Sequence, residues 1–167
     1  PWASGDGFAE GVTFISSATA TNAPSSTDVS TSISTVAALN LVGSSFDCTT
    51  ASAGDKFTGT TKNDTFTGTH LTFEAGDETK GGAGTGDKLV FRNSDADATA
   101  DTLQPVVLDG VETIQVQNIG GAAFTMNLLS ATGVTDVNSY SSTGNVDFAN
   151  VQSLASATID NSDIVFR

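Results

Sequence analysis

The sequence is poor in the residue types on which many functional sites depend. It contains one cysteine, Cys48, and one histidine, His70. A single cysteine excludes an internal disulfide framework and a cysteine-rich zinc site, and a single histidine excludes a metal site with two histidine ligands. We interpret Cys48 as a small, partly buried filler and His70 as an exposed turn residue. No apolar run approaches the ~20 residues that a membrane-spanning helix needs, so we expect no membrane insertion.

Basic residues are also scarce. The chain of 167 residues has 6 Lys and Arg against 19 Asp and Glu, which gives a formal net charge of -13. Binding to nucleic acid depends on Lys and Arg side chains that neutralise phosphates, and binding to an anionic membrane surface has the same requirement. This composition therefore argues against both partners. The acidic excess suits a protein that binds cations.

The composition divides the chain into two regions, residues 1–53 and residues 54–167. Residues 1–53 form an N-terminal Ser/Thr-rich segment with a capping or assembly role, in which Val29, Ile33 and Val36 recur often enough to permit strands. The Ala and Leu residues in STVAALNLV and VQSLASAT allow one short helix at most. Residues 54–167 form the main domain. The chain begins at Pro1 and stops inside a predicted strand, IVFR, so we expect a processed piece of a longer protein.

The second half of the chain has the pattern of many short strands. The segments VETIQVQN, AFTMNLL, VTDVNSY, NVDFANV and SATIDNSDIVF follow one another at regular intervals, with Gly, Asn or Ser between them. Asparagines recur at the strand ends, where stacked coils use them to bond turn backbone groups: Asn118, Asn127, Asn138, Asn145 and Asn150. Aromatic residues make up only 7%, which favours a narrow stacked core of Val, Ile, Leu, Thr and Ala over a sandwich. The pattern predicts an all-β stack of short strands.

Glycine and aspartate recur together between residues 54 and 89, in GDKFTGT, GTTKNDTFTGT and GDETKGGAGTGDKL. Calcium takes six to eight oxygen ligands, and glycine lets backbone carbonyl groups converge while aspartate supplies charge. Phe57, Phe66 and Leu89 each follow an aspartate by two residues, which places both side chains on one face of a strand. The alternative is that each aspartate caps its own turn without metal. The acidic excess favours calcium, because clustered carboxylates repel one another without a counter-ion.

Glu112 is a separate clue. In Val111-Glu112-Thr113-Ile114 it shares the parity of Ile114, on the face expected to point inward. A buried carboxylate is costly unless it is paired or bound to metal. Glu112 therefore either lies near a calcium ion at the open end of its strand or accepts backbone N–H groups from a neighbouring coil. If Val111 and Thr113 face inward instead, Glu112 is simply exposed.

The Gly-Asp blocks, followed by LDGVETIQVQN and ATGVTDVNSYSSTGNVDFANV, resemble the calcium-binding β-helical repeats of bacterial S-layer proteins. These repeats are relatives of RTX (repeat-in-toxin) adhesins exported by type I secretion. The resemblance covers residues 50–167. It implies a right-handed parallel β-helix or β-roll with calcium in the turns of residues 54–167, and an extracellular location at the cell surface.

The candidate calcium ligands are Asp55, Asn63, Asp64, Asp77, Gly82, Gly84, Asp87 and Glu112. The family's nonapeptide is G-G-x-G-x-D-x-L-x, whereas GGAGTGDKL has an additional glycine, Gly86, before Asp87. The repeats are also not in tandem. We therefore expect a few isolated sites rather than a long ladder of ions.

Together with the Gly-Asp turns and the acidic excess, the resemblance implies an extracellular structural protein, a calcium-stabilised subunit of a self-assembling surface layer or filament. The expected partners are further copies of this chain and a cell-surface polysaccharide. The C-terminal segment SATIDNSDIVFR reads as one long apolar strand, and the candidate assembly residues are Ile159, Ile164, Val165 and Phe166.

Two alternatives remain. The chain is a rigid spacer or ligand-binding module of a large secreted adhesin, or it is a β-helical enzyme that acts on polysaccharides. An enzyme of that kind needs paired carboxylates or a basic residue in a cleft, with aromatic platforms for the sugar. Six basic residues and one Trp supply little of this, so we expect no enzyme.

Overall fold

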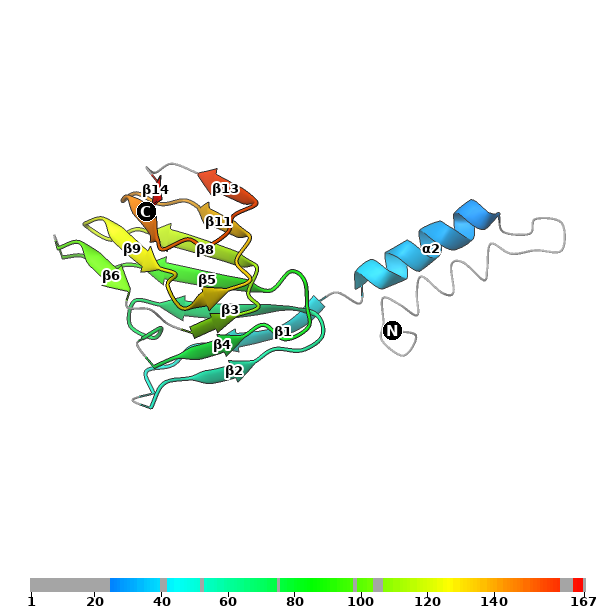
Figure 1. Cartoon of the computed structure of the whole chain (residues 1–167), viewed down its shortest axis with the longest axis horizontal. Helices are drawn as coiled ribbons and strands as arrows, with labels where there is room; N and C mark the ends of the chain where they lie inside the picture. Colours follow the sequence, from blue (N-terminus) through cyan, green and yellow to red (C-terminus); the bar gives the residue numbers. More distant parts are fainter. Residues whose placement is uncertain are drawn as a thin grey trace. The chain divides into compact units, whose positions relative to one another are not determined.

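Short strands dominate the computed structural model (Figure 1). The structure describes residues 25–39, 42–51, 53–74, 76–97, 99–103, 107–159 and 164–166. Every strand pairing whose register is defined in these ranges is parallel. The chain winds through three sheets in about five turns. The prediction of an all-β parallel β-helix is therefore confirmed.

The three sheets run along the stack of coils. The first sheet has the order β1 (Val42–Asp47), β3 (Asn63–Thr69), β5 (Lys88–Asn93), β8 (Thr113–Asn118), β11 (Asp136–Ser139) and β13 (Ser156–Ile159). The second sheet has the order β10 (Ala131–Thr132), β7 (Val107–Asp109), β4 (Glu78–Lys80) and β2 (Lys56–Thr58). The third sheet has the order β14 (Ile164–Phe166), β12 (Val146–Ala149), β9 (Phe124–Asn127) and β6 (Asp101–Leu103). Successive coils thus place strand upon strand in each sheet.

The core lies between the sheets and is built from columns of equivalent residues. Phe66, Leu89, Ile114 and Val137 are partners in register along the first sheet, and each is at most 1% exposed. Residues on either side of them are only partly buried, which is the two-residue period of a strand. These columns give the sheet a continuous apolar inner face.

Phenylalanines fill more of the core than we expected. The core predicted from Val, Ile, Leu, Thr and Ala also contains five buried phenylalanine rings: Phe66, Phe73, Phe91, Phe124 and Phe148. The rings fit because they pack on one another: the centroids of Phe91 and Phe124 are 4.9 Å apart. A low aromatic content does not exclude aromatic packing when most of the rings are gathered in one core.

The C-terminal segment is not one long strand, as predicted, but two short ones. Ser156–Ile159 (β13) pairs with β11 in the first sheet, and Ile164–Phe166 (β14) pairs with β12 in the third sheet. The residues between them, DNSD, are turn-forming types, which explains the break. The side chains of the assembly candidates Ile159, Ile164, Val165 and Phe166 lie outside the described residues.

The strands that Val29 and Ile33 would permit do not form, because residues Ser26–Leu39 form a helix, α2. This helix includes most of STVAALNLV, one of the two segments expected to allow a short helix. Its first turn is closed by reciprocal hydrogen bonds. The Asp28 N–H donates to Ser25 Oγ (3.2 Å), and the Ser25 N–H donates to Asp28 Oδ2 (2.8 Å). This capping box supplies partners for backbone groups that a helix start would leave unbonded. The capped helix is therefore the more stable conformation here, although valine and isoleucine side chains favour β-strands.

Contacts divide the chain into two compact units, 1–42 and 43–167. The predicted boundary was between residues 53 and 54, whereas β1 belongs to the six-stranded sheet of the second unit. Among the described residues, no helix combines the length and apolar character needed to cross a membrane.

Candidate metal centres

Three acidic residues occupy the same position in successive coils, directly before strands of the first sheet. Thr65 is paired with Lys88, and Lys88 with Thr113, so the preceding residues Asp64, Asp87 and Glu112 follow one another along the stack. We call these three residues the first ladder. Asp64 and Asp87 are at most 1% exposed, as are Phe66 and Leu89 two residues later. The predicted pairing of a turn carboxylate with a core side chain is therefore confirmed.

Each carboxylate of the first ladder accepts a backbone N–H from the preceding coil. Asp64 Oδ1 accepts from Ser44 (2.5 Å), Asp87 Oδ1 from Asp64 (2.7 Å), and Glu112 Oε2 from Asp87 (2.8 Å). Asp64 Oδ2 also accepts the N–H of Thr60 at 2.6 Å. Of the alternatives for Glu112, the bond to a neighbouring coil is the one observed. These carboxylates thus bond adjacent coils to one another at positions outside the regular strand-to-strand hydrogen bonds.

Asp87 differs from Asp64 because one of its oxygens has no hydrogen-bond partner. Asp87 is fully buried, yet Oδ2 accepts no hydrogen bond from the described protein atoms. Asn63 Oδ1 is likewise buried and unpartnered. A buried acceptor without a partner carries a desolvation cost of about 1–3 kcal/mol, and more for a charged group. Such atoms therefore indicate a missing ligand or a strained site.

The two turns that hold these atoms stack directly. The Ala83 N–H donates to the Thr60 carbonyl oxygen at 2.9 Å. Gly82 has a φ of +99°, and a Cβ there would collide with the same oxygen. A Cβ on Gly84 would likewise collide with the carbonyl oxygen of Lys62. The predicted ligands Asn63, Asp64, Gly82, Gly84 and Asp87 therefore lie in one pair of turns.

The additional glycine of the motif has a steric reason. A Cβ on Gly86 would lie 2.6 Å from Asn63 Nδ2, so any larger residue would displace the Asn63 amide. Gly86 therefore leaves room for the Asn63 side chain, which lies in the turn of the preceding coil.

Burial raises the pKa of the Asp87 carboxyl above its ordinary value, and the negative charges of Glu112 and Asp64 raise it further. The bond from the Asp64 N–H acts in the opposite direction but is the weaker effect. A bound cation would favour the ionised form of the same group.

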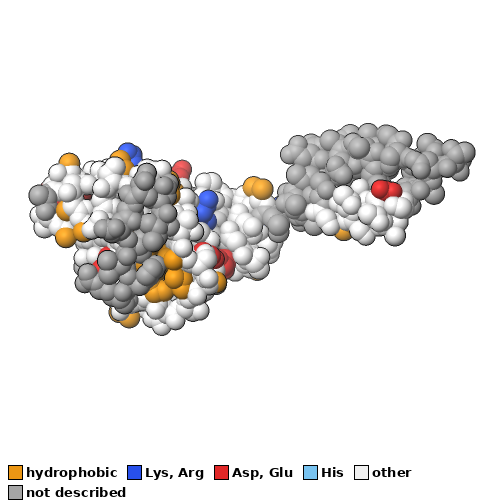
Figure 2. Space-filling model, turned by 90° about the horizontal axis from the view of Figure 1, so that it is seen from above, with side chains coloured by type: hydrophobic (Ala, Val, Ile, Leu, Met, Phe, Trp, Pro, Cys, Tyr) orange, Lys and Arg blue, Asp and Glu red, His pale blue; other side chains and the backbone are white. Residues whose placement is uncertain are grey.

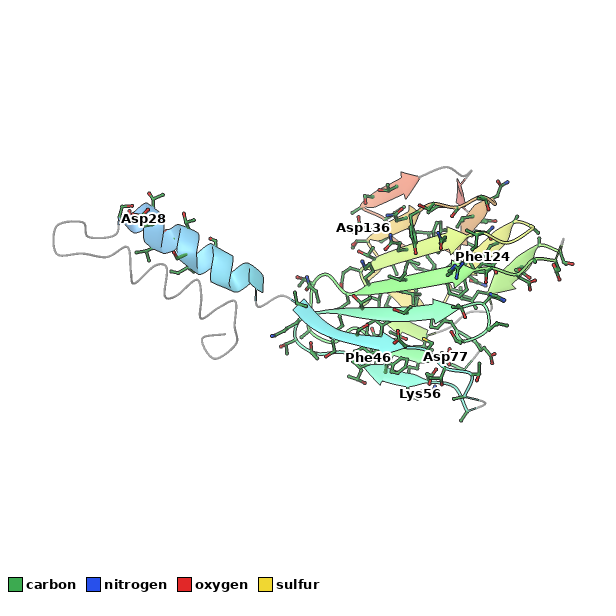
Figure 3. All side chains as sticks on the ribbon, turned by 180° about the vertical axis from the view of Figure 1, so that it is seen from behind. Asp28, Phe46, Lys56, Asp77, Phe124 and Asp136 are labelled. Atoms are coloured by element: carbon green, nitrogen blue, oxygen red, sulfur yellow. The ribbon has the colours of Figure 1, made fainter. Side chains whose placement is uncertain are left out.

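A second acidic pair precedes strands of the second sheet. Asp55 and Asp77 stand before β2 and β4, whose first residues are partners in register. The Asp55 N–H donates to Asp77 Oδ1 (2.7 Å), and the Thr49 N–H donates to Asp55 Oδ2 (2.6 Å). We call Asp55 and Asp77 the second ladder. Figure 3 labels Asp77 at the end of the stack that also carries Phe46.

The second ladder has a neighbour that sequence patterns did not indicate. Cys48 follows β1 directly, and its Sγ and one carboxylate oxygen from each of Asp55 and Asp77 lie within 4.8 Å of one another. Burial raises the pKa of the Cys48 thiol to about 12, and the charges of Asp77 and Asp55 add to this. Cys48 is buried, as predicted for a filler residue. Its place beside two carboxylates depends on how the first coil closes, which no local pattern encodes.

No family model, curated protein or solved structure matches this chain.

Asparagines form a further ladder at the other end of the first sheet, as the sequence predicted for Asn118. Asn93 and Asn118 are partners in register, and Asn93 Nδ2 donates to Asn118 Oδ1 at 3.2 Å. Asn118 Nδ2 donates to the carbonyl oxygen of Asn145 at 2.9 Å. These side chains bond to one another and to backbone groups of the turns.

Charged side chains are sparse on the face of the molecule in Figure 2, where isolated red and blue groups lie among white, uncharged ones. Among the described residues, the ion pairs lie on the second sheet, where Glu78 contacts Lys80 (2.8 Å) and Lys56 (3.5 Å). Neither pair involves a carboxylate of the two ladders. The ladder charges therefore have backbone N–H groups, not lysines, as their bonded partners.

Proposed function

We propose that this chain is a structural module of an extracellular surface layer or filament, and that its β-helix binds calcium in the stacked turns around Asp87. The observation that carries the calcium part is Asp87 Oδ2, a fully buried carboxylate oxygen that accepts no hydrogen bond from any described residue. Cation binding would remove the cost of that arrangement.

The donors at these turns suit calcium. Asp87 Oδ2 and Asn63 Oδ1 are both free of hydrogen bonds, and the glycine-rich turn places backbone carbonyl groups in the same region. Calcium accepts carboxylate, amide and backbone carbonyl oxygens in flexible geometry, whereas magnesium demands a near-ideal octahedron. Asp64 and Glu112 lie one coil to either side of Asp87 and add negative charge. The resemblance to S-layer and RTX repeats favours the same ion.

The hydrogen bonding favours a structural role over catalysis. The carboxylates of both ladders are held by backbone N–H groups of neighbouring coils. A catalytic pair instead faces a cleft with room for substrate and water. Carboxylates that bond coils together stabilise a rod, which is the property a surface array needs.

Assembly follows from the edges of the sheets. Among the described strands, β1 and β13 are the outer strands of the first sheet, and β10 and β2 those of the second. An outer strand presents N–H and C=O groups to which another chain can pair. We propose that β13 and β14, which contain Ile159, Ile164, Val165 and Phe166, join a neighbouring copy in calcium. Such a head-to-tail contact does not close on itself and therefore propagates.

A groove favours a second candidate, a spacer or binding module of a secreted adhesin. It has a volume of about 440 Å³ and runs beside β10, the outer strand of the second sheet. Its apolar lining includes Leu128, Leu129, Val134 and Val151. A partner segment bound there would make this chain a receptor rather than an array subunit.

The calcium site is tested with Asp87→Asn, which keeps the Oδ1 acceptor for the Asp64 N–H and removes the free carboxylate oxygen. Calcium at a hundredfold excess over Kd should stabilise the wild type by about 2.7 kcal/mol. The variant should gain far less, and in EGTA it should be at least as stable as the wild type because it has no buried charge. Thermal melts with and without calcium measure both effects.

The matched control is Asp47→Asn, which removes the same charge from an exposed position on β1. It should keep the wild-type response to calcium. Equal calcium responses of the wild type and Asp87→Asn would contradict this site. A wild-type melt unchanged by EGTA, with no calcium found by metal analysis, would contradict calcium binding altogether.

The assembly part is tested by deleting residues 157–167. Sedimentation and electron microscopy in calcium should show sheets or fibres for the full chain and dispersed particles for the truncated one. A retained melting transition would show that the remaining coils still fold. If the truncated chain forms the same polymer, the contact lies elsewhere. If the full chain stays dispersed at high concentration, the result favours the spacer or binding module of an adhesin over an array subunit.

A further inference from the structure

We propose that Cys48, Asp55 and Asp77 form a second metal site, which binds a thiophilic divalent cation such as Zn²⁺. The three side chains come from the end of β1 and from the turns before β2 and β4. Their potential ligand atoms, one sulfur and two carboxylate oxygens, all lie within 4.8 Å of one another. Zn–S bonds are about 2.3 Å and Zn–O bonds about 2.0–2.2 Å, so ligand atoms around one tetrahedral ion lie about 3.5 Å apart, and the cluster would contract onto the ion.

The thiol is the observation that separates this cluster from an ordinary acidic turn. Cys48 is 8% exposed and forms no disulfide, and its sulfur lies within 4.8 Å of an oxygen of Asp55 and of Asp77. A cysteine that serves only as an apolar filler has no need of carboxylates around it. Here the sulfur stands beside two of them, in the arrangement of a ligand set.

The two carboxylates have free lone pairs and fixed orientations. Asp77 accepts the N–H groups of Asp55 and Glu74, each at 2.7 Å. Asp55 accepts the N–H of Thr49 at 2.6 Å and its hydroxyl at 3.0 Å. An ionised carboxylate offers about four lone-pair positions, so each group has some left for a metal. Backbone donors that hold metal ligands in place are the usual second layer of such sites.

The sulfur determines which metal fits. Calcium and magnesium take oxygen ligands, whereas a thiolate selects softer ions such as Zn²⁺. Three protein ligands leave one position of a tetrahedral zinc site for water or an external ligand. Asp77 and Cys48 are buried but Asp55 is partly exposed, which gives the ion a route of entry. On binding, the S–H bond breaks, the sulfur electron pair forms the metal–sulfur bond, and the proton passes to solvent.

The test uses Co²⁺ as a spectroscopic substitute for Zn²⁺. The full chain, reduced and free of metal, should show a sulfur-to-cobalt charge-transfer band that saturates at one equivalent and disappears when Zn²⁺ is added. Cys48→Ser should abolish the band, and Asp55→Asn should weaken Co²⁺ binding by tenfold or more. Asp109→Asn is the matched control, because it removes an exposed carboxylate of the second sheet that is not part of the cluster. It should bind Co²⁺ as the wild type does.

A second measurement covers variants that fail to fold. Zn²⁺ should slow the alkylation of Cys48 in the wild-type chain, and calcium should not. Asp87→Asn should keep its Co²⁺ band, so failure of the calcium site and failure of this site are distinguishable. The absence of a band at stoichiometric Co²⁺ would overturn the proposal. So would a band that Asp55→Asn leaves unchanged, since the sulfur would then bind cobalt without the cluster.

Discussion

The two ladders share one hydrogen-bond pattern and differ in what stands beside it. In both, a carboxylate before a strand accepts the N–H of the equivalent residue one coil earlier, as Asp87 does from Asp64 and Asp77 does from Asp55. In the first ladder, glycine turns surround a carboxylate oxygen of Asp87 that accepts no hydrogen bond within the described part of the chain. In the second, both oxygens of Asp77 accept N–H groups, and a buried thiol, Cys48, lies beside the carboxylates.

This difference between the ladders shows that bonding a neighbouring coil and binding a metal are separate properties of an aspartate. One oxygen is enough to bond the neighbouring coil, so the second oxygen decides what else the residue can do. Asp64 uses both oxygens for N–H groups, whereas Asp87 uses only Oδ1. The same Gly-Asp turn therefore gives a cap at one coil and a candidate ligand at the next.

The largest expected effect concerns the core side chain that follows each ladder. Phe66 is fully buried and stacks on Phe46 with centroids 5.0 Å apart, whereas Phe57 in the second sheet is only partly buried. Phe66→Ala should lower the free energy of unfolding by about 3–5 kcal/mol, because it leaves a cavity in the core. Phe57→Ala should cost less. Urea denaturation measures the free energy of unfolding of both variants. Equal losses would show that the core side chains beside the two ladders contribute equally to stability.

A smaller effect is expected for the caps themselves. Asp64→Ala removes the acceptor of the Ser44 and Thr60 N–H groups, which should cost about 1–3 kcal/mol even in chelator. The loss should be greater in calcium, because the variant also removes a ligand candidate and a charge next to Asp87. Denaturation in calcium and in EGTA gives both values.

Asp77→Ala is the comparison variant from the second ladder. It also removes the acceptor of two N–H groups, and its loss should be the same in calcium and in EGTA. If Asp64→Ala is equally indifferent to calcium, Asp64 is a turn cap only, and the calcium proposal narrows to Asp87 and its turn.

Much of the fold could be predicted from local patterns. The two-residue alternation in TIQVQN and the asparagines at strand ends are properties of single coils, and repeated coils give a stack. The break inside SATIDNSDIVF was not predicted, because its apolar residues suggest one strand although turn-forming residues separate them. The helix at Ser26–Leu39 includes most of STVAALNLV, where one short helix was allowed, but its start at Ser26 was not predicted. The reciprocal bonds of Ser25 and Asp28 show that the signal was present in the sequence.

The candidate sites were less predictable, because register decides them. The sequence indicated Asp64, Asp87 and Glu112 one at a time, but the bonds between them depend on how one coil lies on the next. Cys48 and Asp77 are far apart in the sequence and meet only when the first coils close. Which oxygen of Asp87 remains without a donor is a consequence of that same stacking and has no counterpart in the sequence.

The smallest expected effect is a pH dependence that tests whether Asp87 Oδ2 is truly without a partner. The pKa of Asp87 is raised above its ordinary value of 3.8, first by burial and then by the charges of Glu112 and Asp64. The folded chain therefore holds this proton more tightly than the unfolded chain does. As the pH rises from 3.8 through the raised pKa, the unfolded state gains relative to the folded one and stability is lost.

Asp136 provides the opposite sign within the same molecule. Hydrogen bonds from Ser156 and Thr135 lower its pKa below 3.8, so its contribution to folding stability is present above that value and is lost as the pH falls through the lowered pKa.

The melting temperature of the wild type minus that of Asp87→Asn, measured in EGTA, isolates the effect of Asp87. This difference should become more negative as the pH rises. The corresponding difference for Asp136→Asn should become more positive. Calcium should flatten the Asp87 curve alone, because a bound cation favours the ionised carboxylate. A flat Asp87 curve in EGTA would mean that a donor already satisfies Oδ2, and the two ladders would then differ only in the cysteine.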